Sequence, residues 1–125
     1  LRREFGFAVV FVTHDLSLLL ELADRIAVMY GGRIVELAPA RDVYHAPRHP
    51  YTTGLRDSFP PLHATSTRLE GIPGTPPDLR ALPPGCAFAD RCPAVMDRCR
   101  TELPVLLPVG ETIVACHLHD EEVPA

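Results

Sequence analysis

Four cysteines are the residues of this 125-residue chain whose type and spacing most directly suggest chemistry. They are Cys86, Cys92, Cys99 and Cys116, separated by five, six and sixteen residues. Four thiolates can hold a zinc ion or an iron–sulfur cluster. Structural zinc sites usually include two cysteines only two to four residues apart, and this chain has no such pair. An iron–sulfur cluster is bulkier than a single ion and tolerates wider spacing.

Spacing alone leaves the cluster and zinc equally favoured. Two disulfides would require an oxidising compartment, and no charged-then-apolar leader indicates export. Four free structural thiols fit poorly with their clustering in a proline-rich stretch that has little apolar material. His117, next to Cys116, could replace one ligand, although two neighbouring residues rarely reach the same metal, and His119 is a weaker candidate.

His14 is the second residue with chemical potential. It follows an apolar, β-branched run at 7–12 that predicts a strand buried on both faces of a parallel sheet. Ligands collect at the carboxyl ends of such strands, and an imidazole beside a helix amino terminus can contact a phosphate. The plainer interpretation is a surface histidine bonded to a nearby carbonyl, and spacing alone leaves both open.

The other polar residues predict no site. His45, His49 and His63 occur in turn-like or helix-end contexts, where we expect caps or solvated side chains rather than ligands. The acidic and basic residues that alternate between the cysteines predict a solvated or ion-paired face; they are Asp90, Arg91, Asp97 and Arg98.

Local patterns predict the elements that position these residues. Asp15 can cap a helix in which Leu16, Leu19, Leu20 and Ala23 form one apolar face. Strands at 26–30 and 33–37 flank a Gly-Gly pair that suits a tight hairpin. We expect further helices at about 40–45 and 50–58, the second beginning at a proline and directing Tyr51, Leu55 and Phe59 to one side. Residues 71–84 predict an extended connector, with a proline-rich ligand for another domain as the alternative.

Composition divides the chain into three stretches and limits its function. All fourteen prolines follow residue 38, so we expect units at 1–38, 39–84 and 85–125. The net charge of −4 argues against nucleic acid as a partner, and no apolar run is long enough to span a bilayer. The chain contains no lysine, and it begins with leucine, so we expect a piece of a longer protein.

Several motifs together resemble one transporter family. The segments Phe-Val-Thr-His-Asp at 11–15 and Leu-Ala-Asp-Arg-Ile-Ala-Val-Met-Tyr-Gly-Gly-Arg-Ile-Val-Glu at 22–36 resemble the carboxyl-terminal part of an ABC transporter ATPase domain. Three later segments are similar to the carboxyl-terminal extension of the ATP-binding subunits of dipeptide, oligopeptide and nickel importers. They are His-Pro-Tyr-Thr at 49–52, Gly-Ile-Pro-Gly-Thr-Pro-Pro at 71–77 and Gly-Cys-Ala-Phe-Ala-Asp-Arg-Cys-Pro at 85–93.

The resemblance implies an α/β fold: the end of an ABC-type nucleotide-binding domain followed by a small, irregular cysteine-rich extension. It implies that His14 is the switch-loop histidine, which contacts the γ-phosphate of ATP bound with Mg²⁺ in the full protein. It also implies a [4Fe–4S] cluster at Cys86, Cys92, Cys99 and Cys116, which places the cluster ahead of zinc. A structural role for the cluster is favoured over electron transfer.

The same resemblance implies partners and a location. A second ATPase subunit, two transmembrane permease subunits and, indirectly, a solute-binding protein would form a peptide importer at the cytoplasmic face of a bacterial or archaeal plasma membrane. The chain contains no phosphate loop, Walker B strand or Leu-Ser-Gly-Gly signature, so we expect it to be inactive as an ATPase by itself. The alternative is a stand-alone interaction module stabilised by zinc or an iron–sulfur cluster.

Overall fold

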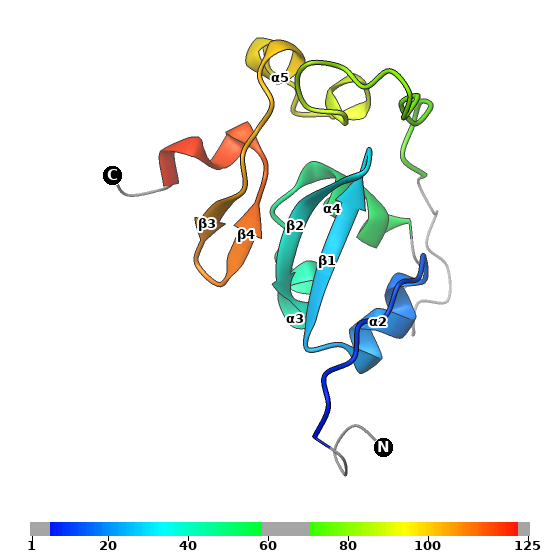
Figure 1. The fold of residues 1–125 in the computed structure, drawn as a ribbon. Coiled ribbons are helices and arrows are strands. Elements are labelled where there is room, and N and C mark those ends of the chain that lie inside the picture. Colours follow the sequence, from blue (N-terminus) through cyan, green and yellow to red (C-terminus); the bar gives the residue numbers. More distant parts are fainter. Residues whose placement is uncertain (1–5, 59–70, 123–125) are drawn as a thin grey trace.

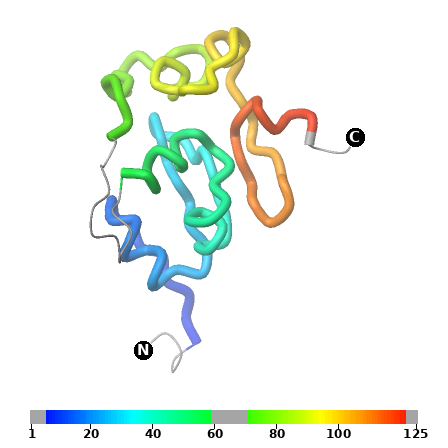
Figure 2. Tube along the Cα trace, turned by 180° about the vertical axis from the view of Figure 1, so that it is seen from behind, coloured from blue at the N-terminus to red at the C-terminus, as the bar shows by residue number. Residues whose placement is uncertain are grey.

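A four-stranded antiparallel sheet organises the chain. The computed structural model describes residues 6–58 and 71–122. The strands are β1 (Arg25–Tyr30), β2 (Arg33–Pro39), β3 (Leu107–Val109) and β4 (Thr112–Val114), in the spatial order β1-β2-β4-β3. Figure 1 shows this sheet with two short helices behind it, and Figure 2 shows the same helices from their own side. The fold is therefore mixed α/β.

The hairpin of β1 and β2 confirms the strongest local prediction. Gly31 and Gly32 have φ angles of +56° and +74°, which glycine adopts without the steric cost that other residues incur. Along β1 the buried residues alternate with exposed ones, so Ile26, Val28 and Tyr30 face the core. This alternation gives the sheet one apolar face.

The helices also begin where local signals predict. Helix α2 (Leu16–Leu22) is capped by Asp15, whose side chain accepts a hydrogen bond from the backbone N–H of Leu18 at 3.1 Å. Helices α3 (Ala40–His45) and α4 (Pro50–Asp57) follow, and α4 has proline in its first turn. Tyr51 and Leu55 pack against the core as expected, whereas the predictions for Phe59 and His63 fall outside the described residues. None of the helices within 6–58 and 71–122 is long and apolar enough to span a bilayer.

The predicted buried strand at 7–12 is wrong. These residues have no regular secondary structure, and Val10 and Val12 are 90% and 96% exposed. A strand requires a hydrogen-bonded neighbour, and none of the four described strands pairs with this segment. The parallel sheet expected around it is likewise absent from the described residues, whose sheet is antiparallel.

The cysteine-containing stretch joins the sheet of the first stretch. Strand β4 pairs with β2 through Glu36–Val114 and Leu37–Ile113, and β3 completes a second hairpin with β4. The rest of this stretch consists of short turns of helix: η1 (Ala89–Arg91), α5 (Asp97–Thr101) and η2 (His117–Glu122). The strands of the second hairpin are three residues long, which is too short to give a recognisable alternation of apolar and polar residues in the sequence.

Arg91 holds the connector against the sheet. Residues 71–84 have no regular secondary structure, in agreement with the expected connector. The guanidinium of Arg91 donates from Nε to the carbonyl of Pro73 at 2.8 Å and from Nη2 to that of Ile72 at 2.9 Å, while Nη1 lies 3.1 Å from the Tyr30 hydroxyl. The prediction that Arg91 belongs to a solvated or ion-paired face is therefore wrong, whereas Asp90 and Arg98 do form ion pairs, with Arg100 and Glu102 respectively.

A buried carboxylate connects the central strand to α4. Glu36 on β2 is completely buried, and its two oxygens accept hydrogen bonds from the backbone N–H groups of Arg48 and His49 at 2.8 and 2.9 Å. Burying a charge is costly unless hydrogen bonds replace its water. These two bonds therefore fix the turn before α4 against β2.

We predict that Glu36→Ala lowers the free energy of unfolding by about 3 kcal/mol, because two N–H groups would lose their buried acceptor. Glu36→Gln should cost about 1–2 kcal/mol, since its carbonyl oxygen can still accept one bond. Urea unfolding followed by circular dichroism measures both. The control is Glu21→Ala on the exposed side of α2, which should change stability by less than about 0.5 kcal/mol. Equal midpoints for Glu36→Ala and Glu21→Ala would contradict the role of this carboxylate.

Candidate functional site

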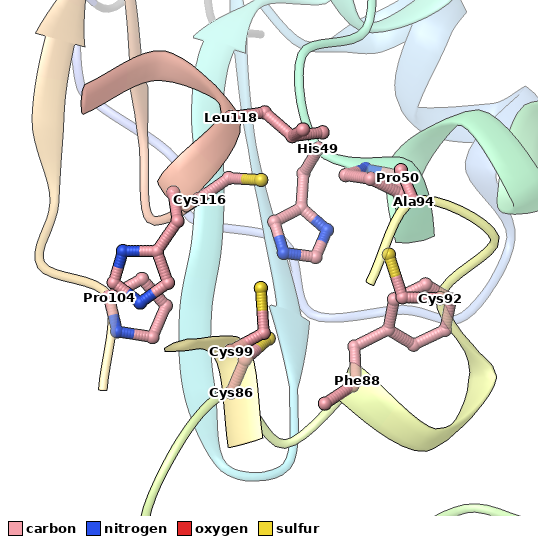
Figure 3. Close-up of a pocket in the computed structure, with 12 residues that line it drawn as sticks. His49, Pro50, Cys86, Phe88, Cys92, Ala94, Cys99, Pro104, Cys116 and Leu118 are labelled. Carbon is pink, nitrogen blue, oxygen red and sulfur yellow. The ribbon is translucent and has the colours of Figure 1, made fainter. Parts of the chain in front are cut away.

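The four cysteine side chains line one small pocket, although they come from four different places in the fold. Cys86 lies before η1, Cys92 follows it, Cys99 is in α5, and Cys116 lies between β4 and η2. Figure 3 shows their side chains around the ring of His49, with Phe88 close to Cys92. All four are free thiols. We call this arrangement the four-cysteine site.

A close backbone contact brings two of the cysteines together. The backbone N–H of Cys86 donates to the carbonyl of Cys99 at 2.7 Å. The preceding residue, Gly85, is buried, and a Cβ added there would lie only 2.3 Å from the same carbonyl oxygen. Glycine is therefore required for α5 to approach Cys86 this closely.

Phe88 anchors the site to the sheet. Its side chain is 2% exposed and belongs to the same core cluster as the β1 residues. The ring contacts Tyr30 edge-on, with 5.2 Å between centroids, and contacts Tyr51 of α4 with 5.4 Å between centroids. Such aromatic pairs add stabilisation beyond the area that they bury. The segment between Cys86 and Cys92 is thereby held over the hairpin turn.

The environment of three of the thiols favours their protonated form when no cation is bound. Burial raises the pKa of Cys86 and Cys92, and it raises that of Cys116 to about 11. The other cysteines raise these pKa values further, because neighbouring thiolates repel one another. A bound metal centre would reverse this preference, with release of protons on binding.

His49 is the site residue that the sequence did not identify as such. It caps α4 as predicted, with Nδ1 accepting the backbone N–H of Tyr51 at 3.0 Å. Its side chain is not solvated, however: the residue is 1% exposed and lines the four-cysteine site. Burial lowers its pKa to about 4, with a further contribution from His119. The only sequence signal, a histidine before a helix-starting proline, indicates a cap and nothing about the cysteines.

The two histidines considered as replacement ligands are bound to other groups. His117 Nδ1 lies 3.0 Å from a carboxylate oxygen of Asp120, and its Nε2 lies 3.0 Å from the carbonyl oxygen of Glu102. His119 Nε2 lies 2.9 Å from the carbonyl oxygen of Arg48. Both nitrogens of His117 are thus engaged, and the structure does not support a ligand role for it.

Whether the four-cysteine site fits a metal centre depends on the size of that centre. Within the described residues, no three histidine, cysteine or acidic side chains are arranged to hold a metal ion. This geometry gives no support to a zinc site, in which four donors must surround one point. A cluster instead attaches its four thiolates to different iron atoms, and it requires thiols arranged around a space. The donor set, four free thiols lining one pocket, fits that requirement.

His14 is not among the residues that line the four-cysteine site. Its side chain is exposed. It directly precedes Asp15 and α2, and α2 lies at the opposite end of the sheet from α5 (Figure 1). The two candidate sites are therefore separate in space.

Comparison with known proteins identifies relatives over most of the chain. The chain is 53% identical over 106 residues to the oligopeptide transport ATP-binding protein OppD of Mycobacterium bovis, covering 84% of the chain and 17% of that protein. It is 41% identical over 125 residues to the dipeptide transport ATP-binding protein DppD of Caldanaerobacter subterraneus, covering 99% and 38%. With the oligopeptide transport ATP-binding protein AppD of Bacillus subtilis, identity is 44% over 122 residues, covering 96% and 37%.

These matches define the family and the extent of the likeness. The chain spans between 17% and 38% of the length of these relatives. The family model for the carboxyl-terminal region of oligopeptide/dipeptide transporters matches residues 35–99, which include most of β2, all of α3 and α4, and three of the four cysteines. Because this match covers more than half of the chain, the chain belongs to the family of oligopeptide/dipeptide transporter C-terminal regions.

Proposed function

We propose that this chain is the carboxyl-terminal part of the ATP-binding subunit of a bacterial ABC importer for dipeptides or oligopeptides. The family match at residues 35–99 carries this proposal, and three relatives named as peptide-transport ATP-binding proteins support it. In the complete importer, two ATP-binding subunits sit peripherally on the cytoplasmic side of two permease subunits. ATP hydrolysis then powers peptide uptake.

His14 is the residue of this chain that we assign to the nucleotide. An imidazole in the switch loop contacts the γ-phosphate of ATP and helps to hold the attacking water. The exposed position of His14, immediately before the Asp15 cap of α2, supports this role because a phosphate from another part of the subunit can reach it. Phosphoryl transfer depends largely on positioning and charge stabilisation, so a single misplaced donor slows it strongly.

We expect His14→Ala in the complete subunit to reduce ATP turnover at least tenfold while ATP binding changes by less than about threefold, because the histidine acts on the γ-phosphate during hydrolysis rather than on the nucleotide as a whole. Phosphate release and equilibrium nucleotide binding measure the two quantities. His45→Ala is the matched control, since His45 is also exposed and lies at the end of α3. Undiminished turnover in His14→Ala would refute the assignment.

We also propose that the four-cysteine site holds a [4Fe–4S] cluster that acts as a structural staple. The support is the meeting of four free thiols from separate short elements around one pocket. The stretch that carries them has only short helices and a small hairpin, so its own core is limited. When bound, a cluster supplies four iron–thiolate bonds, and the free energy of binding contributes directly to folding.

The first test is iron and acid-labile sulfide analysis of protein purified without oxygen. We expect about four irons and four sulfides per chain, with a broad absorption band near 400 nm. Cys99→Ser should remove most of the iron, whereas Ser58→Cys, which adds a thiol outside the site, should not increase it. One zinc per chain and no colour would establish the zinc alternative, and absence of any metal would refute the metal site.

A second test uses the close contact at Gly85. We expect Gly85→Ala to lower the iron content by at least half, because the new methyl group would push Cys86 away from Cys99. Gly71→Ala is the control: a Cβ there meets no atom within 4 Å, and Gly71 has no positive φ angle. Equal iron content in the two variants would show that the approach of α5 to Cys86 does not determine binding.

A further inference from the structure

His49 presents one unused hydrogen-bond donor at the four-cysteine site. Its Nδ1 accepts the N–H of Tyr51, which places the ring hydrogen of the neutral tautomer on Nε2. The other hydrogen bonds recorded for His49 among the described residues use its backbone N–H and carbonyl. The Nε2–H group of the ring is therefore available to donate a further hydrogen bond.

The ring is oriented so that this donor faces sulfur. Figure 3 shows the His49 ring between Cys92 on one side and Cys116 on the other, with its free edge toward Cys99 and Cys86. The remaining neighbours in this pocket are mostly apolar, including Phe88, whose ring centroid lies 5.9 Å from that of His49. A buried N–H among apolar groups requires an acceptor, and the four cysteine sulfurs line the same pocket.

We propose that the Nε2–H of His49 donates a hydrogen bond to a thiolate or sulfide sulfur of the cluster, making His49 a positioning residue that raises the cluster's reduction potential. This inference rests on the cluster proposed above. Hydrogen bonds to the sulfurs are among the factors that set such potentials, because they stabilise the more negative, reduced state.

The same geometry excludes His49 as a fifth ligand in this arrangement. Binding iron through Nε2 would move the ring proton to Nδ1, which would then face the N–H of Tyr51 donor to donor. The helix cap requires the ring proton on Nε2, whereas ligation through Nε2 requires it on Nδ1. The two therefore cannot occur together. In a donor role both ring nitrogens have a partner: Nδ1 accepts from the Tyr51 N–H of α4, and Nε2–H donates to sulfur.

Glu36 fixes the position of this donor. Its carboxylate accepts a hydrogen bond from the backbone N–H of His49, which holds the His49 backbone to β2. The His49 side chain is held to α4 by the hydrogen bond that its Nδ1 accepts from Tyr51. The ring consequently has little freedom to turn away from the cysteines. A cluster bound at this site would be coupled to the central strand through two consecutive hydrogen bonds.

Two substitutions separate the functions of the two ring nitrogens. His49→Asn keeps an acceptor near the position of Nδ1 and a good helix cap, but its shorter side chain loses the donor toward the site. His49→Gln keeps a donor near the position of Nε2 and loses the cap. His45→Asn, at an exposed histidine outside the site, is the control.

The experiment compares iron and sulfide content, reduction potential and thermal unfolding of the protein and the three variants, all purified without oxygen. Potentials are read by dithionite titration followed by electron paramagnetic resonance. We expect His49→Asn to retain the cluster with a more negative potential. His49→Gln should keep a potential closer to that of the unsubstituted protein but unfold at a lower temperature, and His45→Asn should change neither.

Each result has a distinct meaning. Loss of the cluster in His49→Asn but not in His49→Gln would also support the donor role. An unchanged or more positive potential in His49→Asn, or loss of the cluster in both variants, would overturn it while leaving the cluster itself established. If the unsubstituted protein holds no iron, the cluster proposal fails first, and the role of His49 is withdrawn with it.

Discussion

The buried carboxylate of Glu36 is the interaction on which much of the structure depends. It lies on the strand that pairs with β1 on one side and β4 on the other, so it occupies the centre of the sheet. Because the carboxylate is cut off from water, its two oxygens must be met by protein donors, and the N–H groups of Arg48 and His49 are those donors. The start of α4, and with it the ring that lines the four-cysteine site, is set by this requirement.

The cysteine stretch is held to that framework at a few points. Phe88 inserts into the aromatic cluster of Tyr30 and Tyr51, and Arg91 ties the connector to β1. Apart from the β3–β4 hairpin, the backbone there forms only short helical turns, and large apolar side chains such as Val105 and Leu106 stay exposed. A bound cluster would supply what packing lacks there.

The sequence by itself determined the elements whose signals are local. The Gly31–Gly32 hairpin, the Asp15 cap and the proline that begins α4 each depend on the φ angles or hydrogen bonds of a few adjacent residues. The motifs along the chain also indicated its family, which the match at residues 35–99 confirms. The four cysteines could be named as one candidate site, because clustering of a rare, reactive residue is visible in the sequence alone.

Only the tertiary structure determined the features that depend on contacts between residues far apart in the sequence. The apolar run at 7–12 predicted a buried strand, but a strand also needs a neighbour to pair with, and the described sheet offers it none. The β3–β4 hairpin was missed because strands of three residues have no period, and it exists through pairing with β2. His49 has the local pattern of a cap. Its burial beside the four cysteines is visible only in the tertiary structure, because residues far apart in the sequence enclose the ring.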